Sequence, residues 1–148
     1  MFKLNNKGFS LVEVLAVVVI LGVLAVVMVP AVTNIINQNK EDNLNNLKKS
    51  ILSAAKTYIS DNRYNITLDN STCDSTNTSR GISKIGDNIL NDNKLFISKI
   101  SDYLSSTKII NPKDNSELNI ENSYVIIKYD CDSRDYIFDI KDNYLVWN

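Results

Sequence analysis

The sequence predicts an α+β protein in which one long N-terminal helix packs on a small C-terminal antiparallel sheet. Three patterns in the 148 residues support this fold class. Residues 14–32 form an uncharged apolar run, and a helical apolar stripe continues to about residue 58. The last 25 residues hold short β-branched and aromatic segments separated by Asp, Asn and Ser. The length suits one domain with an anchor.

The apolar run is long enough to cross a membrane. A bilayer core requires about 20 apolar helical residues, and residues 9–32 meet that length. The core of a secretory signal peptide is shorter, about 7–15 residues, and precedes a small-x-small cleavage site. The sequence "VPAVTNII" offers no such site. The basic residues Lys3 and Lys7 favour a cytoplasmic N-terminus, which would place most of the chain outside.

Glu13 is unusual at the edge of this run. A lone carboxylate at mid-bilayer costs roughly 2.5–3.5 kcal/mol on insertion scales. One interpretation is a glutamate that reaches the interface from a plain signal anchor. The other is that cleavage of the chain creates the start of the helix just before Glu13.

The segment "KGFSLVEVLAVVVILGVLAVVMVPAV" resembles the processing site and helix of type IV pilins and of the pseudopilins of type II secretion and competence systems. The resemblance covers about the first 30 residues. It implies a leader of residues 1–8, cleaved after Gly8 by a prepilin peptidase. The new terminus, Phe9, would be N-methylated, and Glu13 would become the fifth mature residue. Residues 9–32 would form the transmembrane and assembly half of the helix, and residues 33–148 the pilin head.

The chemistry of the motif agrees with this interpretation. Gly8 leaves the scissile bond accessible because it has no side chain. After cleavage, the amine of Phe9 and the carboxylate of Glu13 would share one helix face at i, i+4 spacing. By resemblance, Glu13 is an assembly residue that meets the amine of a neighbouring subunit. Gly22 and Pro30 match family positions that give the helix flexibility, although membrane helices in general also tolerate both residues.

Beyond Pro30 the helix is expected to become amphipathic and to end at about Ser60, giving a total length of roughly 75 Å at 1.5 Å per residue. Asn, Lys, Glu and Asp occupy its other faces. The apolar stripe needs a cover, which the C-terminal segments can supply. It consists of Val32, Ile35, Ile36, Leu44, Leu47, Ile51, Ala54, Ala55 and Tyr58.

The remaining segments predict a loop, a short helix and three strands. Residues 61–92 are polar and rich in turn-forming residues such as Asn, Asp, Ser and Gly, which is typical of a long loop. Residues 93–105 show helical spacing, and a turn region follows Pro112. The segments "SYVIIKYD", "DYIFDIK" and "NYLVWN" indicate consecutive antiparallel strands.

Cys73 and Cys131 are the only cysteines. A disulfide between them would tie the long loop to the sheet, and oxidation is common in exported domains. Two free buried thiols are the alternative.

Three aspartates of "DCDSRD", namely Asp130, Asp132 and Asp135, are weak calcium candidates, because some pseudopilins bind calcium in their C-terminal region. Their spacing does not match an EF-hand loop, and an acidic turn is usually just solvated. Asn65, Asn70 and Asn77 each begin an Asn-x-Ser/Thr triplet, which so Asn-rich a stretch also produces by chance.

The inventory of reactive groups argues against an enzyme and predicts no cofactor. The chain has no histidine, which removes the usual general base and the commonest metal ligand. No phosphate loop, nucleophile elbow or paired-acid signature is present. The net charge of −1 provides no basic excess for nucleic acid, so no direct nucleic-acid site is evident.

The sequence therefore favours a structural subunit of a type IV pilus or of a type II secretion-like filament. By resemblance, its partners are other pilin subunits, the prepilin peptidase and methyltransferase, and the assembly platform with its ATPase. The precursor would sit in the cytoplasmic membrane with its head outside, and the mature chain in a filament. The alternative is an uncleaved, membrane-anchored extracytoplasmic binding or sensor module. Major pilin, minor pilin and pseudopilin are not separated, nor are adhesion, motility, DNA uptake and secretion.

Overall fold

The computed structural model describes residues 10–148, apart from the side chains of Val27 and Ala31. By its internal contacts the chain divides into two compact units, residues 1–40 and 41–148. One helix, α1 (Leu11–Asp61), contributes to both units. Its C-terminal end agrees with the prediction from the apolar stripe, whereas its expected first residue, Phe9, lies outside the described residues.

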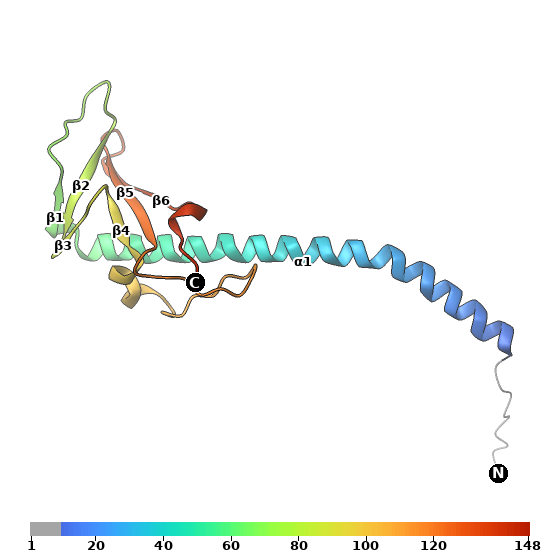
Figure 1. Ribbon diagram of the computed structural model, residues 1–148. Helices are drawn as coiled ribbons and strands as arrows, with labels where there is room; N and C mark the ends of the chain where they lie inside the picture. The colour runs from blue at the N-terminus through green and yellow to red at the C-terminus, as the bar shows by residue number, and fades with distance from the viewer. Residues whose placement is uncertain (1–9) are drawn as a thin grey trace, which may run out of the picture. The chain divides into compact units, whose positions relative to one another are not determined.

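The second unit contains a six-stranded antiparallel sheet that lies against the second half of α1 (Figure 1). The central path is β1-β2-β5-β4, with β3 paired to β2 and β6 paired to β5. The strands are β1 (Ile66–Leu68), β2 (Ser79–Ile85), β3 (Asn88–Ile89), β4 (Lys94–Phe96), β5 (Tyr124–Asp130) and β6 (Asp135–Asp139). Three 3₁₀ helices complete the fold: η1 (Arg63–Asn65), η2 (Ile97–Tyr103) and η3 (Asp142–Tyr144). This arrangement confirms the predicted α+β class.

The core of the second unit forms where the apolar stripe of α1 meets the sheet. Ile51 and Ala55 on the helix, and Val125 and Ile127 on β5, are fully buried. The hydroxyl of Tyr58 accepts a hydrogen bond from the side chain of Asn88 at 2.7 Å, which attaches the helix to the β2–β3 hairpin. The sheet is therefore the cover that the amphipathic half of the helix requires.

The prediction of one long loop over residues 61–92 was wrong. This segment contains β1, β2 and β3. The overlooked signal is Gly86–Asp87, a two-residue connection between β2 and β3 in which Gly86 has a φ of +56°. Two-residue hairpin loops favour glycine because they require positive φ.

The prediction of a short helix over residues 93–105 was right only in part: residues 97–103 form the 3₁₀ helix η2, but strand β4 takes the place of the expected first turn. Asp92 and Asn93 adopt left-handed backbone conformations, with φ of 53° and 61°. The side-chain oxygen of Asn93 accepts a hydrogen bond from the N–H of Ile82 at 2.7 Å. This tertiary contact directs the chain into the sheet and overrides the helical spacing.

Of the three C-terminal segments expected as strands, the first two form the β5–β6 hairpin. The third forms η3 instead and contributes one isolated bridge, between Leu118 and Trp147.

Gly81 on β2 lies where two side chains approach the backbone closely. A Cβ atom at this position would clash with Oδ2 of Asp69 and would lie 2.6 Å from Oδ1 of Asn93. The carbonyl of Gly81 accepts the N–H of Asp69 at 2.9 Å. A side chain here would displace the groups that join β1, β2 and β4.

Replacing Gly81 by Ala is expected to destabilise the head by about 1–3 kcal/mol, the usual cost of overpacking a tight site. Gly22→Ala is the matched control, since a Cβ atom there meets no other atom within 4 Å. Urea unfolding of the detergent-solubilised chain, followed by near-ultraviolet circular dichroism, measures the difference. Equal midpoints for the Gly81→Ala variant and the parent chain would contradict the packing argument.

Candidate functional site

The start of α1 is closed by a reciprocal pair of hydrogen bonds between Ser10 and Glu13. The N–H of Ser10 donates to Oε2 of Glu13 at 2.8 Å, and the N–H of Glu13 donates to Oγ of Ser10 at 3.3 Å. The carbonyl of Ser10 accepts the first helical bond, from Val14 at 3.2 Å. This geometry is a capping box, which satisfies two N–H groups that a helix start leaves without partners.

The sequence analysis missed this role of Ser10. The signal was available, since Ser followed three residues later by Glu, before an apolar run, is the signature of a capping box. Glu13 thus has a structural partner inside the chain. A carboxylate in the first helical turn is also favoured by the helix dipole.

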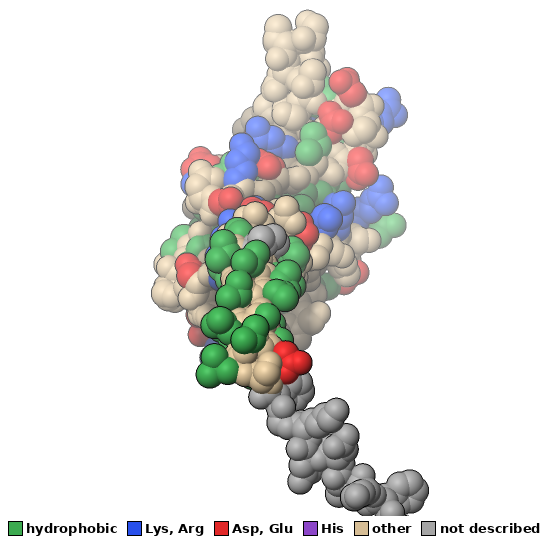
Figure 2. Space-filling model, turned by 90° about the vertical axis from the view of Figure 1, so that its right-hand side faces the viewer, with side chains coloured by type: hydrophobic (Ala, Val, Ile, Leu, Met, Phe, Trp, Pro, Cys, Tyr) green, Lys and Arg blue, Asp and Glu red, His purple; other side chains and the backbone are tan. Residues whose placement is uncertain are grey.

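The apolar part of α1 is uncovered in the first unit. Every large aliphatic side chain described between Leu11 and Ile36 is exposed, with exposed fractions from 45% to 83%. Figure 2 shows these side chains covering the helix surface that faces the viewer. Among residues 10–148, α1 is the one helix long and apolar enough to cross a membrane.

The predicted flexibility residues lie inside α1. Pro30 has no N–H to donate to the carbonyl of Val26. The hydroxyl of Thr33 bonds to the carbonyls of Val29 at 3.2 Å and Pro30 at 3.0 Å. Hydroxyl bonds of this type weaken a helix slightly. That Pro30 makes the helix flexible here stays a prediction, since α1 continues through this position. A Cβ atom placed on Gly22 would have no neighbour within 4 Å, apart from the backbone of its own helix.

The predicted cleavage and methylation residues, Gly8 and Phe9, lie outside the described residues, as does the leader. Their roles therefore stay predictions.

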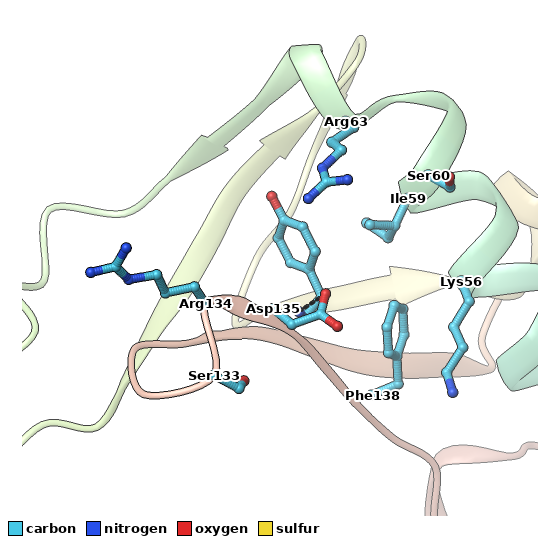
Figure 3. Close-up of a pocket in the computed structure, with 9 residues that line it drawn as sticks. Lys56, Ile59, Ser60, Arg63, Ser133, Arg134, Asp135 and Phe138 are labelled. Atoms are coloured by element: carbon cyan, nitrogen blue, oxygen red, sulfur yellow. Dashed lines mark hydrogen bonds between the residues drawn. The ribbon is translucent and has the colours of Figure 1, made fainter.

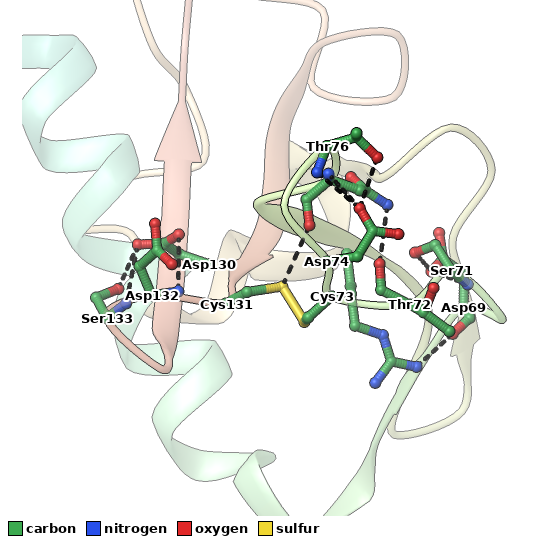
Figure 4. The surroundings of a disulfide bond; sticks show 12 residues. Asp69, Ser71, Thr72, Cys73, Asp74, Thr76, Asp130, Cys131, Asp132 and Ser133 are labelled. Atoms are coloured by element: carbon green, nitrogen blue, oxygen red, sulfur yellow. Dashed lines mark hydrogen bonds between the residues drawn. A yellow bond between two sulfur atoms is a disulfide. The ribbon is translucent and has the colours of Figure 1, made fainter.

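Cys73 and Cys131, for which the sequence left two interpretations open, are joined by a disulfide (Figure 4). The bond attaches the loop of residues 69–78 to the end of β5. The N–H of Cys131 also donates to the carbonyl of Thr78 at 2.9 Å, which continues the β2–β5 pairing by one residue. For cysteines 58 positions apart, the chain-entropy model credits such a bridge with roughly 4 kcal/mol.

Aspartate side chains organise the turns on both sides of the disulfide. Oδ1 of Asp74 accepts bonds from the N–H and hydroxyl of Thr76 and from the N–H of Asn77, at 2.6–2.8 Å. These bonds hold the pKa of Asp74 below its ordinary value. A hydrogen bond from Ser71 lowers the pKa of Asp69 in the same way, and one from Ser133 lowers that of Asp130.

The three aspartates suggested as calcium ligands lie at the β5–β6 hairpin, where Asp130 and Asp135 are paired across the strands. Asp130 accepts the hydroxyl of Ser133 at 2.6 Å, and Asp135 accepts the N–H of Tyr136 at 2.8 Å. Within residues 10–148, no group of three or more His, Cys, Asp or Glu side chains is placed to hold a metal ion.

Comparison with known families agrees with the N-terminal geometry. The family model described as the prokaryotic N-terminal methylation motif matches residues 3–29. This motif is the signature of type IV pilins and pseudopilins, so the chain carries the processing signal of a pilin-like precursor. No curated protein and no solved structure gives a significant match. The motif and the pilin-like layout of helix and sheet point to a structural protein rather than an enzyme.

The hydrogen bonds of Asp74 predict an acid transition in the disulfide loop. The folded pKa of Asp74 lies below its ordinary value of 3.8. Its stabilising contribution is therefore complete above about pH 4 and is lost as the pH falls through the lower, folded pKa. We expect the amide NMR signals of Thr76 and Asn77 to shift with a midpoint below 3.8. Asp74→Asn should abolish this transition. A midpoint at or above 3.8 in the parent chain would refute the role given to these bonds.

Proposed function

We propose that this protein is a structural subunit, pilin or pseudopilin, of a type IV pilus or a type II secretion-like filament. In this proposal the prepilin peptidase removes residues 1–8 and methylates Phe9. Residues 9–32 then anchor the precursor in the cytoplasmic membrane, with the head of residues 33–148 outside, and later pack in the filament core. The assembly platform and its ATPase drive the transfer.

One observation carries the proposal: the part of α1 from Leu11 to Ile36, which includes the motif, exposes all of its described large aliphatic side chains, and nothing in its own unit covers them. Such a surface is stable only in lipid or against other apolar surfaces. A pilin-type filament supplies both in turn, lipid for the precursor and neighbouring helices for the assembled subunit. Gly22 suits this use, since a helix without a side chain at that point can be approached closely.

A second function rests on the capping box. The carboxylate of Glu13 already accepts a hydrogen bond from Ser10. Helix capping alone is therefore enough to explain a glutamate at position 13. The same capping role would suit an uncleaved anchor that holds the head as a binding or sensor module. The two functions differ in whether the charge of Glu13 is needed by a second chain.

Substitutions at Glu13 separate these two functions. Glu13→Gln keeps the ability to cap the helix but removes the charge, whereas Ser10→Ala removes the hydroxyl of the cap and keeps the charge. For a filament subunit we expect Glu13→Gln and Glu13→Ala to be processed normally yet to reduce sheared surface filaments at least tenfold. Ser10→Ala should assemble nearly as well as the parent. Immunoblots of membrane and sheared fractions from the native host give the readout.

Gly8→Leu serves as the processing control and should leave the precursor uncleaved in the membrane. The filament proposal would be refuted if the parent chain gave no sheared surface filaments, or if Gly8→Leu were cleaved normally. Assembly of Glu13→Gln like the parent would refute only the role given to the charge of Glu13. Full assembly of Glu13→Gln combined with failure of Ser10→Ala would assign Glu13 to capping alone.

A further inference from the structure

A groove of about 530 Å³ lies in the head between the last turns of α1 and strand β6. Figure 3 shows its two walls. Lys56 and Ser60 come from the helix and Arg63 from η1 after it, while Asp135, Tyr136 and Phe138 come from β6. All of these residues belong to the second unit. The volume falls within the range of small-molecule sites.

The groove carries a surplus of positive charge. Lys56, Arg63 and Arg134 line it together with a single acid, Asp135. Within the described part of the chain, no ion pair joins any of these three cations to a carboxylate. The amine of Lys56 lies 5.8 Å from the ring centre of Phe138, and Arg134 points away from the groove in Figure 3. Lys56 and Arg63 are thus the cations available to an anion inside it.

The other polar groups that line the groove favour a ligand that also donates hydrogen bonds. Oδ1 of Asp135 accepts the N–H of Tyr136 at 2.8 Å, which leaves the other carboxylate oxygen for a hydroxyl donor. Ser60 adds a hydroxyl on the opposite wall. Ile59 and Phe138 supply an apolar surface between the polar groups. A small inorganic anion would use one of the two cations, but neither the apolar surface nor the acceptor.

A nucleic-acid strand fits this groove poorly. Asp130 at the end of β5, Asp132 in the following turn and Asp135 at the start of β6 would repel a row of phosphates. The ring of Tyr136 makes an edge contact with that of Tyr129 at a centroid distance of 5.7 Å. This contact leaves less of the Tyr136 ring for base stacking than a single-strand binding groove offers.

We propose that this groove binds one carboxylated sugar residue, a sugar acid such as a uronic acid. Arg63 binds the sugar carboxylate, since a guanidinium pairs with a carboxylate through two parallel hydrogen bonds. Lys56, which extends toward the other end of the groove in Figure 3, donates to a sugar hydroxyl. Asp135 accepts a ring hydroxyl, and the carbon face of the sugar lies against Phe138. This binding is independent of filament assembly, because every residue involved lies in the head.

Saturation-transfer NMR on the detergent-solubilised full chain tests the proposal, with glucuronate as the probe and glucose as the neutral match. We expect glucuronate to give saturable signals and glucose to bind at least tenfold more weakly. Arg63→Gln and Lys56→Gln should each weaken glucuronate binding about tenfold, the effect of losing one charge-assisted hydrogen bond. Lys49→Gln, which removes an exposed cation of the same helix outside the groove, should have no effect.

Two further probes are used. One shows whether the ligand is a free sugar acid or part of a polysaccharide, and the other shows whether the groove binds nucleic acid instead. Tighter binding of an alginate oligomer than of glucuronate would assign the site to a polysaccharide chain, and weaker binding to a free sugar acid. Equal binding of glucose and glucuronate would overturn the proposal, as would glucuronate binding that survives both Gln substitutions. A thymidine oligonucleotide that binds through Arg63 and Lys56 while glucuronate does not would assign the groove to nucleic acid instead. Circular dichroism checks that each variant is folded.

Discussion

The exposed apolar surface of α1 is the constraint on which the rest of the structure depends. Burying one Val, Leu or Ile side chain is worth about 1.5–3 kcal/mol, and the described segment from Leu11 to Ile36 exposes more than a dozen of them. The sum exceeds the net stability of a typical domain, about 5–15 kcal/mol. This surface therefore decides where the chain can exist, namely in lipid or in contact with other apolar helices.

The polar features of the same helix follow from that constraint. In lipid an unsatisfied backbone N–H is costly, because no water is present to bond it. Ser10 and Glu13 satisfy two such groups at the helix start, and Thr33 bonds to two carbonyls next to Pro30. In the proposed filament, Glu13 additionally offers its negative charge to a neighbouring subunit. One carboxylate then serves both the fold of the single chain and the register between chains.

The sequence allowed the helix and the β5–β6 hairpin to be predicted because both depend on local periodicity. The stripe through Ile51 and Ala55 had to be buried, and the sheet covers it. β1 and β3 were missed because they are short, and β2 because its main partners, β1 and β5, lie far from it in the sequence. The groove at Lys56 and Arg63 could not be predicted, since its walls are about 75 residues apart in sequence and only the fold joins them.

The central claim, that this chain is processed as a pilin-type subunit, is tested most directly by N-terminal mass spectrometry. The protein would be purified from membranes and from sheared surface material of its native host. The account predicts a chain that begins at N-methylated Phe9 in both fractions. A chain that begins at Met1 would contradict it and would favour the membrane-anchored module.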